Sequence, residues 1–173
     1  MNQNRFIPVF LLVLVLHVLV VNFFNLSAFV SLTLLPLLIF CLPVSCGTVA
    51  ALLIAFACGF VADFLAGGMI GMSSAALLCV ALVRRPLLRL FFGNETFSRQ
   101  ENLSFNRQSP VKILASLSSF IALYLLVFIM LDNAGTRPLW VNAVCFISSL
   151  AASVVISMIL ARVLLSSQEN RWR

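Results

Sequence analysis

The chain has 173 residues, of which 62% are hydrophobic and only 9% are charged, and its formal net charge is +6. Soluble domains usually carry about 25% charged residues, so this composition excludes an ordinary soluble domain. The apolar runs are continuous and do not alternate every second residue, which excludes the strands of a membrane β-barrel. The composition therefore predicts an all-α integral membrane protein.

Six apolar segments follow one another along the chain. A helix that crosses a bilayer needs roughly 20 residues, and we expect each segment to cross once. They cover residues 6–24, 28–44, 48–65, 69–83, 111–131 and 139–165. We expect a single domain consisting of a six-helix transmembrane bundle. The polar stretch 93–110, which is rich in turn-forming residues, is expected to be a mobile loop.

The first segment, FIPVFLLVLVLHVLVVNFF, is either a membrane helix or a cleaved signal peptide. It is longer than the 7–15 residue apolar region of a signal peptide and lacks an AxA-like cleavage site, which favours the helix. His17 lies in the middle of this segment and is the only histidine in the sequence. We expect a neutral, hydrogen-bonded core residue there and no metal site.

The second segment carries Pro36 and Pro43, which predict a kinked helix because proline removes a helical hydrogen bond. Five cysteines lie in or beside the apolar runs, and none forms a CxxC pair. We expect them to behave as small hydrophobic residues. A disulfide between Cys41 and Cys46 is the alternative.

The third and fourth segments join through GFVADFLAGGMIGMSSAA, in which the carboxylate of Asp63 stands beside glycines. Ala55 and Gly59 belong to a row of small residues that would allow a neighbouring helix to approach closely. Three glycines follow Asp63 and would provide a tight reversal into the fourth segment, where a positive φ is needed. These glycines are Gly67, Gly68 and Gly71.

Asp63 has three interpretations, because an ionised carboxylate costs roughly 2.5–3.5 kcal/mol within a membrane. It caps a backbone N–H at the start of the fourth segment or bonds a hydroxyl such as that of Ser73. It contacts a partner or opens an intramembrane pocket. It couples to a proton or ion, which is disfavoured because no second intramembrane acid would form a relay.

Basic residues give the orientation through the positive-inside bias. With the N-terminus in the cytoplasm and six crossings, only Arg137 of the eleven basic residues lies outside, which leaves ten inside. Arg84, Arg85 and Arg89 alternate with Leu and Phe, as in a segment at the inner interface near anionic lipid. A plain stop-transfer flank is the alternative.

Trp140, near the start of the sixth segment, is expected at the outer interface. The segment has a row of small residues at four-residue spacing. That row includes Cys145, Ser149, Ser153, Ser157 and Ala161. We expect it to be a helix-packing seam in which hydroxyls bond across the contact for roughly 0.6 kcal/mol each.

No nucleotide-binding loop, zinc-protease motif, hydrolase elbow or paired carboxylates occur in the sequence. The residues therefore predict no enzyme activity, no cofactor, no metal and no nucleic-acid partner.

The stretch GFVADFLAGGMIGMSSAALLCVALVRRPLLRL resembles the rod shape-determining MreD family, in particular Bacteroidota-like members. Gly59, Asp63, Gly67 or Gly68, and Gly71 match the family's hairpin, and the step from Arg85 to Pro86 matches the one before its cytoplasmic loop. The resemblance implies a non-enzymatic scaffold of the bacterial cell-elongation complex in the inner membrane. Expected partners are MreC, the filament protein MreB, the complex's glycosyltransferase and transpeptidase, and membrane lipids.

The same resemblance implies a fold like that of the S components of ECF vitamin transporters. This provides the rival function, a small-molecule-binding subunit of a membrane transporter. Such a subunit should carry polar pocket residues on its outer loops. The outer connections expected here are very short, which disfavours it.

Overall fold

The computed structural model describes residues 6–23, 31–42, 46–66, 69–98, 110–133 and 138–169. Most of these residues are helical, and none of them lies in a strand. The helices are α1 (Phe6–Phe23), α2 (Leu35–Cys41), α3 (Thr48–Ala66), α4 (Met72–Ser98), α5 (Pro110–Asn133) and α6 (Leu139–Glu169).

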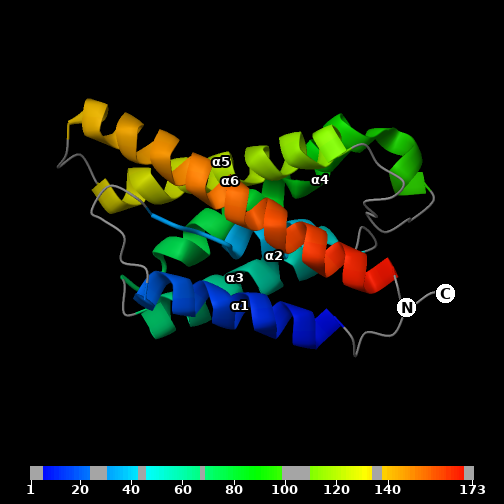
Figure 1. Cartoon of the computed structure of the whole chain (residues 1–173), viewed down its shortest axis with the longest axis horizontal. Helices are drawn as coiled ribbons and strands as arrows, with labels where there is room; N and C mark the ends of the chain where they lie inside the picture. Colours follow the sequence, from blue (N-terminus) through cyan, green and yellow to red (C-terminus); the bar gives the residue numbers. More distant parts are fainter. Residues whose placement is uncertain are drawn as a thin grey trace.

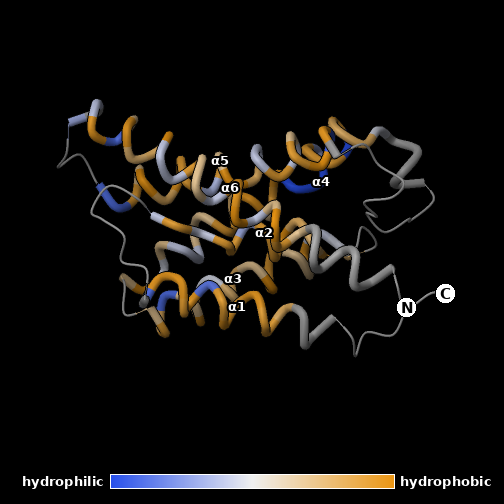
Figure 2. Tube along the Cα trace, viewed as in Figure 1, coloured by the Kyte–Doolittle hydropathy of each residue, from blue (hydrophilic) through white to orange (hydrophobic). Residues whose placement is uncertain are grey.

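Three of the helices are long and apolar enough to cross a membrane, over Thr48–Ala66, Val111–Asn133 and Trp140–Ala161. Apolar residues cover most of the described helices, and a hydrophilic stretch lies on α4 (Figure 2). Large hydrophobic side chains also point outward, with Val49 72% and Ile147 67% exposed. Outward faces of this kind suit lipid and not water. The chain is therefore a helical membrane protein.

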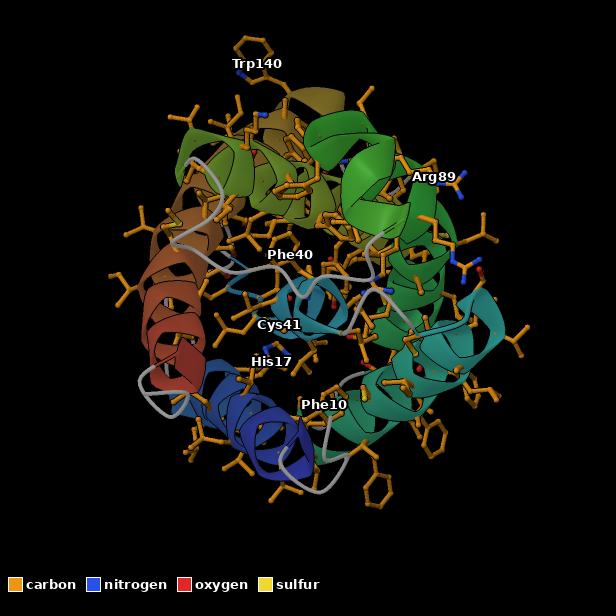
Figure 3. The ribbon with its side chains drawn as sticks, turned by 90° about the vertical axis from the view of Figure 1, so that its right-hand side faces the viewer. Phe10, His17, Phe40, Cys41, Arg89 and Trp140 are labelled. Carbon is orange, nitrogen blue, oxygen red and sulfur yellow. The ribbon has the colours of Figure 1, made fainter. Side chains whose placement is uncertain are left out.

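The short helix α2 lies in the middle of the bundle, and the other described helices surround it (Figure 3). Every residue from Leu35 to Phe40 is buried. The Phe40 ring packs edge-on against Phe120 of α5, with ring centroids 5.7 Å apart. A helix of 7 residues is too short to cross a bilayer, and the backbone groups at its ends need partners from the protein. This explains why the bundle closes around α2.

The structure differs from the expectation of a kinked membrane helix over 28–44. Residues 31–34 are not helical, and α2 is only 7 residues long. Pro36 lies in the first turn of α2, where a missing N–H costs nothing, so the proline starts the helix and does not bend it. Pro43 lies outside the described residues.

The fourth segment also differs from its expected bounds. Helix α4 continues well past residue 83, contains Pro86, and bends at Gly93, where φ is +76°. The expected mobile loop 93–110 is therefore helical at its start, up to Ser98, and at its last residue, where α5 begins. Residues 99–109 lie outside the described part.

The helices run back and forth along the long axis of the molecule (Figure 1). The start of α1, the end of α4, the start of α5 and the end of α6 lie at the same end of the bundle (Figure 1). Trp140, 82% exposed, lies near the opposite end, at the start of α6. The basic residues of α4 and Lys112 of α5 are thus on elements that reach one common end.

Candidate functional site

The connection between α3 and α4 is organised by the carboxylate of Asp63. Its Oδ2 accepts hydrogen bonds from the backbone N–H of Gly71 at 2.8 Å and of Ser73 at 3.1 Å. Its Oδ1 lies 3.3 Å from the same Ser73 nitrogen. The first N–H groups of a helix have no partner within the helix, so these contacts satisfy two N–H groups at the start of α4. The capping contact expected from the sequence is present, and Asp63 is only 5% exposed.

Gly59 lies where α3 comes close to the backbone of α4. A Cβ atom added there would be 2.4 Å from the Cα of Ser74 and 2.6 Å from its nitrogen. These are backbone atoms, which cannot move aside as a flexible side chain can. One turn before Gly59, Ala55 is also fully buried. The small residues of α3 therefore pack against another helix, as the sequence predicted.

Gly71 provides the turn into α4. Its φ is +103°, a conformation that residues with a Cβ rarely adopt, although the space around it is open. Gly67 and Gly68, the other glycines predicted to form this reversal, lie outside the described residues.

The non-helical segment 31–34 is held by side chains from two helices. Ser149 Oγ of α6 accepts a hydrogen bond from the Ser31 N–H at 2.9 Å, and Ser153 Oγ accepts one from the Thr33 N–H at 3.1 Å. His17 Nδ1 of α1 accepts one from the Leu34 N–H at 3.3 Å. Irregular backbone at membrane depth is tolerated only where protein groups satisfy it. The histidine and two serines do so here.

We call Ser149, Ser153 and Ser157 of α6 the serine row. We expected it to form a packing seam, but it also binds the backbone of segment 31–34. Ser149 and Ser153 act as acceptors for the non-helical backbone, while Ser157 is fully buried and its Oγ has no hydrogen-bond partner among the described residues.

Tyr124 of α5 is buried close to both regions, since Ser73, Thr33 and Asp63 all lie near its side chain. The Oγ1 of Thr33 makes no hydrogen bond among the described residues. His17 also lies within the range of the Asp63 charge. We call this set of residues the polar core: His17, Thr33, Asp63, Ser73, Tyr124, Ser149 and Ser153. It extends from the hairpin to segment 31–34.

The prediction that Arg84, Arg85 and Arg89 all line the inner interface is wrong for Arg84, which is buried. It is only 2% exposed, and its Nη2 donates a hydrogen bond to the carbonyl of Leu42, the residue that caps the C-terminal end of α2. The last carbonyls of a helix lack helical partners and carry partial negative charge, so a buried cation stabilises that end. Arg84 therefore holds the central helix. Arg85 and Arg89 do face outward.

The described residues contain no group of three His, Cys, Asp or Glu side chains that could hold a metal ion. All five cysteines are free, which excludes the Cys41–Cys46 disulfide in this structure. The structure thus brings Gly59, Asp63 and Gly71 together in one hairpin, and Ser149 and Ser153 together with His17.

Sequence reasoning missed the non-helical segment 31–34 and the burial of Arg84. Pro36 could have indicated that the residues before it are not helical, since proline favours the first turn of a helix. Comparisons with protein-family models, with curated proteins and with solved structures each found no match.

Proposed function

We propose that the chain is a non-enzymatic membrane scaffold of the bacterial cell-elongation complex, like the MreD family that its sequence resembles. The observation that carries this proposal is the α3–α4 hairpin. Gly59, Asp63 and Gly71, on which the resemblance rests, form one structural unit. The first glycine allows the close contact, the carboxylate caps α4, and the second glycine makes the turn.

The use of the interior polar groups supports a scaffold. His17, Ser149 and Ser153 bind backbone N–H groups, and Arg84 binds the end of α2. These residues hold the fold, which leaves the outer faces of the bundle for binding. On this proposal those faces recruit MreC, and through it or directly MreB and the glycosyltransferase and transpeptidase of the complex.

The scaffold would be a six-span protein of the inner membrane with both termini in the cytoplasm. The common end reached by α4, α5 and the basic residues on them would then be the cytoplasmic end, in agreement with the positive-inside bias (Figure 1).

The proposal is tested by co-purification and rescue. Tagged protein is produced together with MreC in cells depleted of their own MreD. We expect MreC to co-purify with it and rod shape to return. Round cells and no retained MreC would contradict the proposal. A parallel thermal-shift screen against vitamins addresses the rival, and a specific rise in Tm with one vitamin would favour an S-component-like subunit.

A further inference from the structure

The arginines of α4 separate into two groups with different surroundings. Arg84 points inward to the end of α2. Arg85 and Arg89 point outward and line a shallow pocket of about 540 Å³ together with Pro86 and Leu90. Figure 3 shows Arg89 directed away from the ring of helices. The pocket therefore lies on the outer surface of the bundle and not in its polar core.

The lining of this pocket combines positive charge with apolar surface. Arg85 and Arg89 are four residues apart, so their side chains are neighbours on one helix face. Leu90 is 79% exposed, and Leu82, one turn before Pro86 toward the middle of α4, is 63% exposed. No acidic residue is among the four that line the pocket. An occupant should carry negative charge beside a long apolar part.

We propose that this pocket binds the phosphate group of an anionic membrane phospholipid. The phosphodiester would lie between the two guanidinium groups, which match phosphate geometry with two parallel N–H donors each. The acyl chains would run past Leu82 toward the middle of α4. Charge complementarity and the adjoining leucines favour a lipid over a soluble phosphate, because a free anion would leave the apolar part of the site without a partner.

The test uses the full chain purified in a neutral detergent. Native mass spectrometry counts retained phosphatidylglycerol during titration, with phosphatidylcholine as the zwitterionic comparison. A basic residue near an anionic surface contributes about 1 kcal/mol, which is about fivefold in affinity. We expect phosphatidylglycerol binding to fall about fivefold in Arg85→Gln and in Arg89→Gln, and about 25-fold in the double variant, if the two contributions add.

The matched control is Lys112→Gln, which also removes one exposed positive charge near the same end but does not line the pocket. We expect it to bind within about twofold of the unaltered protein, because Lys112 is not among the residues that line the pocket. Arg85→Lys/Arg89→Lys keeps the charge and loses the paired donors, so its affinity should fall between those of the unaltered protein and the double glutamine variant. Circular dichroism and gel filtration check the fold of every variant.

Equal losses of phosphatidylglycerol affinity in Lys112→Gln and Arg85→Gln would overturn the proposal, since binding would then depend on the overall charge of the protein. Unchanged binding in Arg85→Gln/Arg89→Gln would overturn it as well. Displacement of the lipid by inorganic phosphate at equal concentration would show that the pocket takes free phosphate and not lipid. If the double variant fails the folding check, the two single variants decide.

Discussion

At the scale of single residues, the buried polar side chains of this protein act mainly on backbone groups. Segment 31–34 has no helical hydrogen bonds, and its last two residues are buried. Ser149, Ser153 and His17 accept hydrogen bonds from its backbone instead. A buried N–H that loses its acceptor costs about 1–3 kcal/mol, more than a hydrogen bond usually contributes net. We therefore expect the serines of α6 to contribute unequally to stability, according to whether each one accepts a backbone hydrogen bond.

Ser153→Ala and Ser157→Ala test this inequality. Both serines are fully buried on the same face of α6, but only Ser153 accepts a hydrogen bond from segment 31–34. We expect Ser153→Ala to lower the free energy of unfolding by about 1–3 kcal/mol, and Ser157→Ala to change it by less than about 0.5 kcal/mol. Thermal unfolding in detergent gives both values. Equal losses would mean that the serines matter only for packing.

Asp63→Asn separates capping from a charged contact. One oxygen, Oδ2, accepts both the Gly71 and the Ser73 N–H groups, so an asparagine oxygen can keep both bonds without the charge. We expect Asp63→Asn to accumulate nearly as the unaltered protein does. Asp63→Leu should lose about 0.5–2 kcal/mol of stability with its cap.

Membrane abundance and MreC co-purification are measured for both Asp63 variants in one strain. Normal abundance of Asp63→Asn without MreC would assign the charge to partner binding. If Asp63→Leu equals the unaltered protein in both assays, the carboxylate has neither role.

At the scale of elements, the α3–α4 hairpin depends on a backbone contact that admits no side chain. Gly59→Ala would place a methyl group 2.4 Å from the Ser74 Cα, so the two helices must separate. We expect Gly59→Ala to cost about 1–3 kcal/mol, the usual range for overpacking, and Gly59→Leu to reduce accumulation further. Gly47→Ala is the control, because a Cβ added at Gly47 would meet no atom within 4 Å and the φ of this residue is not positive. Equal apparent Tm values for Gly59→Ala and Gly47→Ala would contradict the close contact.

The sequence predicted the elements unevenly, and the reasons are physical. Four of the expected segments are helices close to their expected bounds, because a long apolar run in a membrane satisfies its backbone hydrogen bonds only as a helix. These segments are 6–24, 48–65, 111–131 and 139–165. Segment 28–44 did not, since acceptors for its backbone come from His17 and the α6 serines, which are distant in sequence. The hairpin was predictable because its glycines and carboxylate are local. The burial of Arg84 was not predictable, because its hydrogen-bond acceptor lies at the end of α2, which is distant in sequence.

At the scale of the whole molecule, α2 and segment 31–34 connect the surrounding helices. α6 and α1 hold the non-helical segment, α4 holds the end of α2 through Arg84, and α5 packs on Phe40. Tyr124 of the polar core lies close both to the hairpin and to this centre.

The orientation of the bundle in the membrane is the last prediction. The ends of α4 and α6 and the starts of α1 and α5 share one end of the molecule, and ten of the eleven basic residues belong to the segments expected at that end (Figure 1). Because basic residues are retained in the cytoplasm, reporter fusions after Asn106 should be active only as cytoplasmic reporters. Fusions after Gly135, in the connection between α5 and α6, should be active only as periplasmic reporters. A fusion after Leu165, near the end of α6, serves as a second cytoplasmic point and controls for truncation of the last helix. Activity of a periplasm-only reporter after Asn106 would reverse the assignment, and it would also place the arginine-lined pocket of α4 on the outer side of the membrane.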